Sequence, residues 1–413
     1  MIEFRDYQND IIKRGAEVLK NNGFLYLAME VRTGKTLTSL GIADKMGVEH
    51  VLFLTKKKAI SSIVSDYDLM CPASFILFTI NYESLHKLPQ NINWDIIILD
   101  EAHGMGAIPK PNKRARDVKA LIKKNNSKVI LMSGTPTPES FSQMYHQVYG
   151  IPGNPYGEYA SFYKFAKVYV DVRQRKINSM MINDYSRGLE TIIDKMNPYT
   201  IRFTQKEAGF ENDIVEELLE VEMSPVTYSI TSKLKKYLVV EGSDDVILAD
   251  TPVKLMMKLH QLYSGTVKFE SGNSMILDLS KAEFIYNNFC TSKVGIFYKF
   301  KEELNALKQV YGDQLCTELE EFNSTDKTIA LQIVSGREGI SLRNAEFLVY
   351  YNIDFSATSY WQSRDRMTTK ESTLSKVFWV FSKGGIEKEI YKAVIQKKDY
   401  TLKHFKKDLL TLN

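Results

Sequence analysis

The stretch FLYLAMEVRTGKT, residues 24–36, decides the fold. Its first half, Phe24–Met29, is a continuous apolar run, which is typical of a strand buried on both faces of a parallel sheet. The second half is a short loop that ends in Gly34, Lys35 and Thr36, where a helix is expected to begin. This order directs backbone N–H groups and a helix N-terminus toward an anion. The stretch therefore predicts a phosphate-binding loop in an α/β domain.

The side chains of this loop suggest individual roles. Lys35 is predicted to reach the β- and γ-phosphates of ATP, and the Thr36 hydroxyl is predicted to ligate Mg²⁺. The other predicted loop residues are Arg32, Thr33 and Gly34. The strict GxxxxGK[ST] pattern is not met, because Met29 holds the place of the first glycine. The loop therefore needs support from other motifs.

A second motif, DEAH at residues 100–103, follows the apolar run Ile96–Leu99. Asp100, at the tip of a strand beside a phosphate loop, is predicted to hold Mg²⁺, and Glu101 to accept a proton from the attacking water. The alternative is an exposed acidic turn, which the phosphate loop upstream disfavours. SGTP at residues 133–136 also follows an apolar run. By itself it is only a turn, but it supports the interpretation because it comes third, after the phosphate loop and DEAH.

Strand-like apolar runs recur in both halves of the chain. They are Phe24–Met29, Val51–Thr55, Phe75–Ile80, Ile96–Leu99 and Val129–Met132, then Val294–Tyr298, Ile329–Val334, Phe347–Tyr351 and Val377–Phe381. The text between them is aromatic and basic. Within it, residues 166–184 resemble a basic hairpin, and Pro252–Ser264 reads as a helix with proline in its first turn. We predict two α/β domains, 1–150 and 276–413, and a connecting segment, 151–275.

The bulk composition excludes several classes. A net charge of +4, from 54 basic and 50 acidic residues, is too small to indicate nucleic-acid binding by itself. Cys71, Cys290 and Cys316 form no CxxC pair, which favours a reducing cytoplasm and argues against structural zinc. No apolar run approaches the roughly 20 residues of a membrane helix, and the acidic start is unlike a signal peptide. We expect a cytoplasmic chain with no membrane partner.

Taken in order, the motifs resemble those of superfamily 2 helicases and, within them, the Snf2-like branch. The matches are FRDYQ (Phe4–Gln8), LAMEVRTGKT, INYESL (Ile80–Leu85), LDEAH, MSGTP, LHQLYSG (Leu259–Gly265), FYKFKEEL (Phe297–Leu304), VSGREGISL (Val334–Leu342), YWQSRDRM (Tyr360–Met367) and GIEKEIYKA (Gly385–Ala393). The resemblance covers nearly the whole chain. It implies two RecA-like lobes in tandem, with ATP and Mg²⁺ bound in the cleft between them and Gln8 reading the adenine edge.

The resemblance also implies a contribution from the second lobe. In the family, a glutamine and two arginines of this lobe face the γ-phosphate, and an arginine there stabilises the charge of the transferring group. Gln362 and Arg366 match, but Thr369 stands where the second arginine is expected. Lys370 or Arg364 is a candidate substitute. The departure puts the rate of hydrolysis in question more than the type of reaction.

Contacts to nucleic acid are implied at the ends of several predicted strands. The residues are Thr55, Lys56, Asn81, Tyr82, Ser335, Gly336 and Arg337. Hydroxyls, amides and cations bind the phosphate backbone without a base code, which suits a motor that moves over any sequence. The basic residues of the hairpin, Arg173, Arg175 and Lys176, form either a wedge at a strand junction or a solvated turn.

These observations favour an ATP-driven DNA translocase or helicase that acts on duplex or branched DNA in replication, recombination or repair. RNA stays open as a substrate. The alternatives are a remodeller that displaces proteins from duplex DNA without strand separation, and a weakly hydrolysing DNA clamp. The compact chain is typical of a phage or bacterial motor. The sequence indicates no protein partner and is compatible with a monomer.

Overall fold

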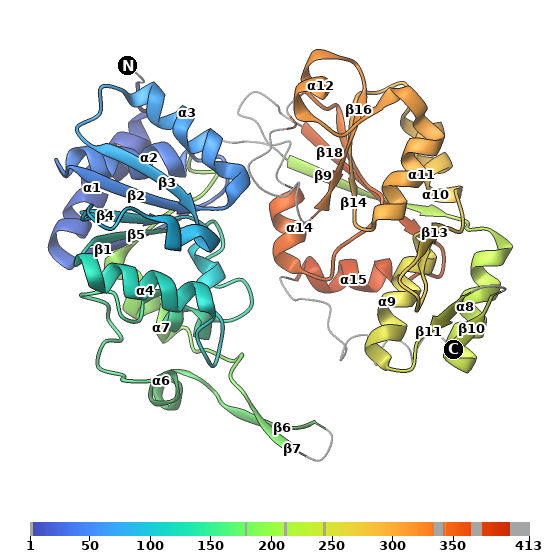
Figure 1. The fold of residues 1–413 in the computed structure, drawn as a ribbon, viewed down its shortest axis with the longest axis horizontal. Coiled ribbons are helices and arrows are strands. Elements are labelled where there is room, and N and C mark those ends of the chain that lie inside the picture. The colour runs from blue at the N-terminus through green and yellow to red at the C-terminus, as the bar shows by residue number, and fades with distance from the viewer. Residues whose placement is uncertain are drawn as a thin grey trace. The chain divides into compact units, whose positions relative to one another are not determined.

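The computed structural model describes residues 3–177, 180–209, 213–242, 245–333, 342, 344–364 and 374–396. The chain forms two compact units, Met1–Gly209 and Phe210–Asn413. Each unit holds a six-stranded sheet whose strands all run parallel, with helices packed against it (Figure 1). The crossover connections of a parallel sheet place helices on its faces. The predicted fold of two RecA-like α/β lobes is confirmed.

The sheet of the first unit contains the five strands expected from the apolar runs and one further strand. In spatial order they are β3 (Ile76–Asn81), β2 (His50–Thr55), β4 (Ile96–Leu99), β5 (Lys128–Met132), β1 (Phe24–Met29) and β8 (Thr200–Phe203). The helices are α1 (Asp6–Asn22), α2 (Lys35–Lys45), α3 (Ile60–Met70), α4 (Lys113–Asn125), α5 (Met144–Val148), α6 (Phe162–Tyr169) and α7 (Thr191–Met196). Two short 3-10 helices matter for the site, η2 (Tyr82–Lys87) and η3 (Ala102–Met105).

Side chains of strand β1, which lies between β5 and β8, alternate between two cores. Phe24 and Tyr26 pack into the core shared with α4 to α7, whereas Leu25, Leu27 and Met29 pack into the core shared with α1 to α3. All five side chains are fully buried. Burial on both faces explains why the strand appears in the sequence as an uninterrupted apolar run. It also fixes the start of the loop that follows Met29.

The second unit repeats this arrangement with its own strands. In spatial order they are β15 (Leu315–Cys316), β16 (Thr328–Gln332), β14 (Val294–Tyr298), β17 (Phe347–Tyr350), β18 (Leu374–Ser382) and β9 (Asp213–Val221). Its helices are α8 (Pro225–Tyr237), α9 (Pro252–Tyr263), α10 (Ser280–Phe289), α11 (Lys301–Tyr311), α12 (Leu319–Ser324), α14 (Ala357–Arg364) and α15 (Glu387–Val394). The predicted helix with proline in its first turn is α9. No helix among the described residues of either unit is long and apolar enough to cross a membrane.

The segment 151–275, predicted as a separate connection, is divided between the two units. Its strand β8 extends the first sheet beside β1, and its strand β9 extends the second sheet beside β18. Both are edge strands. In β9 charged and apolar residues are interspersed, which suits a sheet edge and conceals the strand in a search for continuous apolar runs. The division into two units therefore differs from the predicted boundaries.

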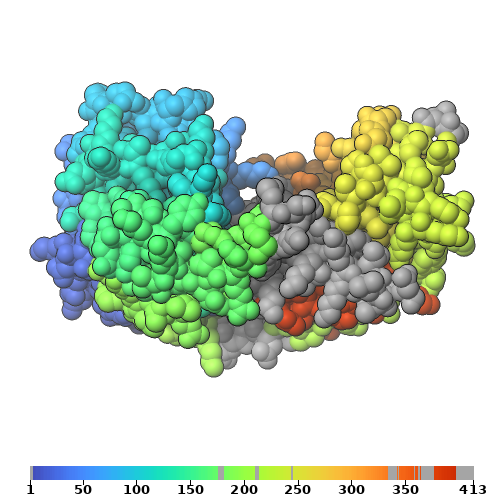
Figure 2. All heavy atoms as spheres, turned by 90° about the horizontal axis from the view of Figure 1, so that it is seen from below, coloured from blue at the N-terminus to red at the C-terminus, as the bar shows by residue number. Residues whose placement is uncertain are grey.

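A hairpin is present within the predicted residues 166–184, but it is shorter, because residues 166–169 belong to α6. β6 (Arg173–Ile177) and β7 (Met180–Asp184) pair antiparallel as a two-stranded sheet, separate from both six-stranded sheets. In Figure 1 this ribbon extends away from the sheet of the first unit beyond α6, and Figure 2 views the molecule from the side on which it lies. An isolated two-stranded ribbon has little core to hold it.

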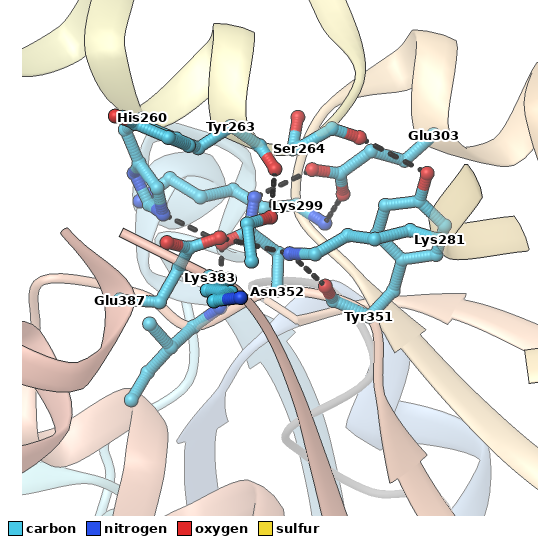
Figure 3. A network of polar contacts seen from close by, with 12 residues as sticks. His260, Tyr263, Ser264, Lys281, Lys299, Glu303, Tyr351, Asn352, Lys383 and Glu387 are labelled. Atoms are coloured by element: carbon cyan, nitrogen blue, oxygen red, sulfur yellow. Dashed lines mark hydrogen bonds and ion pairs between the residues drawn. The ribbon is translucent and has the colours of Figure 1, made fainter. Parts of the chain in front are cut away.

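A buried polar network ties the second unit together (Figure 3). Lys281 and Glu387 are both fully buried and form an ion pair of 2.8 Å, and the Lys281 ammonium also donates to the Tyr351 carbonyl at 3.1 Å. The side-chain amide of Asn352 donates to Glu303 Oε1 at 2.5 Å. The network thus joins α10, α11, α15 and the end of β17 inside one unit.

Candidate active site

The phosphate loop is held in a conformation that its glycine makes possible. Gly34 has φ +78° and precedes the first residue of α2, and a Cβ atom there would lie 2.4 Å from Nε2 of Gln8. Only glycine avoids both the left-handed strain and this clash. Lys35 turns its ammonium back over the loop and donates to the Met29 carbonyl at 2.9 Å. Met29, which breaks the motif in the sequence, therefore contributes its backbone oxygen.

Gln8 is buried against the same loop. Its Nε2 approaches the Gly34 carbonyl at 3.5 Å, and its Oε1 accepts from the backbone N–H of Arg5 at 3.0 Å at the start of α1. Tyr7 donates its hydroxyl to the Thr33 carbonyl at 3.2 Å. The FRDYQ motif thus anchors the phosphate loop from the N-terminal helix.

The two carboxylates of the DEAH motif differ in their surroundings. Asp100 directly follows β4, and its Oδ2 accepts from the Thr55 hydroxyl at 2.8 Å. Glu101 has φ +49° and ψ +46°, a left-handed conformation that costs a non-glycine residue roughly 1–2 kcal/mol. Such strain tends to occur at functional positions. Glu101 Oε2 lies 3.1 Å from Nδ1 of His103.

Electrostatics separate the two carboxylates further. Burial and the adjacent charge of Glu101 raise the pKa of Asp100, and the Thr55 hydrogen bond and the Lys35 charge offset this only in part. Burial also raises the pKa of Glu101, but the His103 contact and the positive charges of Lys35 and Lys56 outweigh it, so that this pKa is lowered. At neutral pH Glu101 is therefore held as the carboxylate, while Asp100 lacks full compensation for its charge.

His103 connects the DEAH motif to the SGTP motif. Its Nδ1 lies 2.9 Å from the Ser133 hydroxyl, which in turn accepts from the backbone N–H of Thr135 at 3.1 Å. A Cβ atom added at Gly134 would lie 3.4 Å from the Lys35 ammonium. The phosphate loop, the carboxylates and the SGTP turn therefore converge at the carboxyl ends of β1, β4 and β5.

The structure corrects two of the predicted nucleic-acid contacts. Thr55 is fully buried and its hydroxyl is committed to Asp100. Tyr82 is 4% exposed and donates its hydroxyl to the Asp100 carbonyl at 2.5 Å. Both side chains therefore bond to Asp100, and they expose little or no surface to a phosphate backbone. Lys56 and Asn81, each next to one of these residues, are partly exposed.

The remaining predicted residues lie elsewhere. Arg173, Arg175 and Lys176 are on β6, where the Arg173 guanidinium pairs with Asp171 at 3.1 Å. Gln362 is on α14. Arg366 and the residues Ser335, Gly336 and Arg337 lie outside the described residues. The roles suggested for these residues stay predictions.

Residues 44–264 match the model of the SNF2-related domain, and this match covers more than half of the 413 residues. The chain belongs to the SNF2-related family. One similar solved structure is the SWI2/SNF2 ATPase core of Sulfolobus solfataricus in complex with dsDNA, with 15% identity, 96% of this chain and 91% of that chain covered, and a TM-score of 0.44. Another is the SWI2/SNF2 ATPase core domain from the same organism, with 16% identity, 96% of this chain and 89% of that chain covered, and a TM-score of 0.42. No curated protein matches the chain.

Sequence reasoning missed two residues that shape the candidate site of this SNF2-related chain. Gln205 follows β8, donates its backbone N–H to the Glu30 carboxylate at 2.8 Å and its amide to the Val31 carbonyl at 3.0 Å, and so braces the phosphate loop. Arg114 lies over the Tyr82 ring at 4.4 Å. Neither belongs to a motif, and both reach the site through contacts between residues far apart in the chain.

Proposed function

We propose that this SNF2-related chain is a DNA-stimulated, Mg²⁺-dependent ATPase that translocates on duplex or branched DNA in replication, recombination or repair. The observation that carries the proposal is the convergence of Lys35, Asp100 and Glu101 at one edge of the first sheet. Membership of the SNF2-related family supports DNA as the track. In open α/β sheets, ligands bind outside the carboxyl ends of the strands, where these three residues lie.

The residues present fit Mg-ATP. The Thr36 hydroxyl and the Asp100 carboxylate are hard oxygen donors, and Mg²⁺ is usually held by one or two such groups together with the phosphates of its substrate. When bound, the cation neutralises charge that develops on the transferring phosphoryl group. The described residues contain no group of three His, Cys, Asp or Glu side chains that would hold a cation alone.

The chain's own groups then divide the chemistry. Lys35 already directs its ammonium over the loop and neutralises phosphate charge there. Glu101, ionised and held near His103, accepts a hydrogen bond and then the proton of the attacking water. Its buried Oε2 lies 3.1 Å from His103 Nδ1, and the carboxylate has further lone pairs with which to bind a water. We assign Gln8 to the adenine edge, and Gln362 and Arg366 to the γ-phosphate.

For the DNA track we assign Lys56 and Asn81 of the first unit, Ser335, Gly336 and Arg337 of the second unit, and the hairpin residues Arg173, Arg175 and Lys176. The hairpin favours strand separation over translocation alone, since it is an exposed basic ribbon outside both sheets. Contacts of this type bind the phosphate backbone, and their affinity falls with rising salt.

Two assays test the proposal together. The first measures ATP hydrolysis with single-stranded, duplex, forked and four-way DNA and with matching RNA, and duplex or branched DNA should stimulate most. The second measures displacement of a labelled strand from a fork in parallel with displacement of a protein from linear duplex. Strand displacement supports a helicase. Protein displacement alone supports a remodeller, and DNA binding without turnover would leave only the clamp.

A further inference from the structure

The Glu83 carboxylate is held as a phosphate would be held. Asn81 donates its amide to Glu83 Oε2 at 3.0 Å, and the Arg114 guanidinium donates to Oε1 at 2.9 Å. Glu83 is largely exposed, with 65% of its side chain accessible, whereas Arg114 is at 26%. An exposed ion pair contributes little to stability, and arginine pairs with phosphate are often bidentate and stronger. A backbone phosphate therefore competes well for Arg114.

The surroundings of Arg114 have room for such a ligand. Its side chain lines an open cavity of about 860 Å³ between η2 and α4, together with Tyr82, Glu83, Lys113 and Lys124. The lining also includes Asp117, so three cations face two carboxylates and the balance is positive by one charge. The cavity lining includes Tyr82 and Glu83, which directly follow Asn81. Asn81 is one of the residues predicted from the sequence to contact nucleic acid.

Arg114 is also connected to the carboxylate that we assign to Mg²⁺. The guanidinium lies 4.4 Å from the centre of the Tyr82 ring, and the Tyr82 hydroxyl donates to the Asp100 carbonyl at 2.5 Å. On its other side, the guanidinium lies against η3, which continues the DEAH motif and together with it is called the acidic loop, since a Cβ atom at Gly104 would be 2.8 Å from Nη1 of Arg114. One side chain therefore contacts the cavity, the tyrosine and the acidic loop.

We propose that Asn81 and Arg114 form a site for a DNA backbone phosphate in which Glu83 is the built-in competitor, and that Tyr82 is a positioning residue that transmits occupancy to Asp100. This inference rests on the proposed function. A phosphate that displaces Glu83 draws the guanidinium toward the cavity, changes its contact with the Tyr82 ring, and thereby alters the support beneath Asp100.

The test measures the duplex-DNA concentration that gives half-maximal ATPase stimulation. Glu83→Gln removes the competing charge and should lower this concentration several-fold, a gain that misfolding cannot produce. Arg114→Gln should raise it about tenfold and reduce the slope of log affinity against log salt by about one. Arg116→Gln is the matched control. Arg116 is an exposed arginine of the same helix, and its guanidinium donates a hydrogen bond to the Pro111 carbonyl.

Tyr82→Phe tests the transmission. It keeps the ring under Arg114 and removes the hydroxyl, so the DNA requirement should stay constant while the Mg²⁺ concentration for half-maximal activity rises. An unchanged Mg²⁺ requirement would refute the role of Tyr82. Equal DNA requirements in Arg114→Gln and Arg116→Gln, or a higher one in Glu83→Gln, would refute the phosphate site. Wild-type ATP hydrolysis that does not respond to DNA would refute the proposed function. In that case, fluorescence anisotropy of labelled duplex DNA would still compare the DNA affinities of the Arg114→Gln and Arg116→Gln variants.

Discussion

Each unit holds a lysine whose ammonium donates to a main-chain carbonyl near acidic residues, but Lys281 is fully buried and Lys35 is only half-buried. In the second unit, Lys281 pairs with Glu387 at 2.8 Å, and both side chains have no solvent exposure. In the first unit, Lys35 bonds the Met29 carbonyl, and its contribution to Asp100 and Glu101 is electrostatic. Lys281, a buried charge with an internal partner, stabilises the fold of its unit. We propose that Lys35, which is half-buried, is placed for the phosphates of a bound nucleotide.

Glutamates show the same contrast. Glu303 accepts from the Asn352 amide and from the backbone N–H groups of Lys299 and Phe300, so both of its oxygens are satisfied within the unit. His260, next in this network, is kept neutral because burial lowers its pKa well below the ordinary range. Glu101, by comparison, sits in a left-handed backbone conformation. The network of the second unit is structural, and the acidic pair of the first unit is arranged for chemistry.

The largest expected effect is on turnover. Lys35→Ala should abolish ATP hydrolysis, because the cation that neutralises β- and γ-phosphate charge is lost, while the unfolding midpoint stays near that of the wild type. Phosphate release and urea unfolding of the same preparation measure both quantities. Hydrolysis near the wild-type rate would show that Lys35 does not serve the phosphates.

Lys281→Met should show the opposite pattern: it should lower the stability of the second unit through a residue outside the candidate ATP site. Removing one partner of a buried ion pair leaves Glu387 uncompensated, which typically costs about 3–5 kcal/mol of unfolding free energy. Urea unfolding followed by tryptophan fluorescence in a Trp94→Phe background reports the second unit, since Trp361 and Trp379 both belong to it. The double variant Lys281→Met with Glu387→Leu should recover most of the loss. An unchanged midpoint in the single variant would contradict the structural role.

Asp100→Asn should have a smaller effect on the unfolding free energy than Lys281→Met, and it should stabilise the protein where Lys281→Met destabilises it. Because the folded pKa of Asp100 lies above its unfolded value, its ionisation opposes folding: the penalty is absent below the unfolded pKa and fully present above the folded one. Without Mg²⁺, the variant should therefore be more stable than the wild type at neutral pH, by about 1 kcal/mol. The gain should disappear as the pH falls below the unfolded pKa. A destabilised variant at pH 7 would contradict this assignment.

The smallest expected effect concerns the hairpin. Replacing Arg173, Arg175 and Lys176 with Ala should reduce unwinding of forked DNA a few-fold and spare DNA-stimulated hydrolysis, since the ribbon lies outside both sheets. Unchanged unwinding would make the hairpin a solvated turn. A parallel loss of both activities would place it in the general DNA-binding surface.

The sequence predicted best what local pattern determines. Strand β1 was predicted to the residue, because burial on both faces leaves a continuous apolar run. Strand β9 was missed, because an edge strand tolerates charges among its apolar residues. Thr55 and Tyr82 were predicted to contact nucleic acid because the sequence indicates where the strands end. It does not indicate in which direction the side chains of these two residues point. The contact of His103 with Ser133 and that of Arg114 with Tyr82 join residues about 30 positions apart, and no motif spacing encodes them.

The most direct test of the account compares wild-type protein with Glu101→Gln in steady-state phosphate release, with and without duplex DNA. Binding of labelled Mg-ATP is measured on the same samples. The account predicts that DNA raises wild-type turnover several-fold, and that Glu101→Gln binds Mg-ATP but does not hydrolyse it, because an amide keeps the shape without accepting the proton. Wild-type turnover that ignores DNA, or a Glu101→Gln variant that turns over at the wild-type rate, would contradict it.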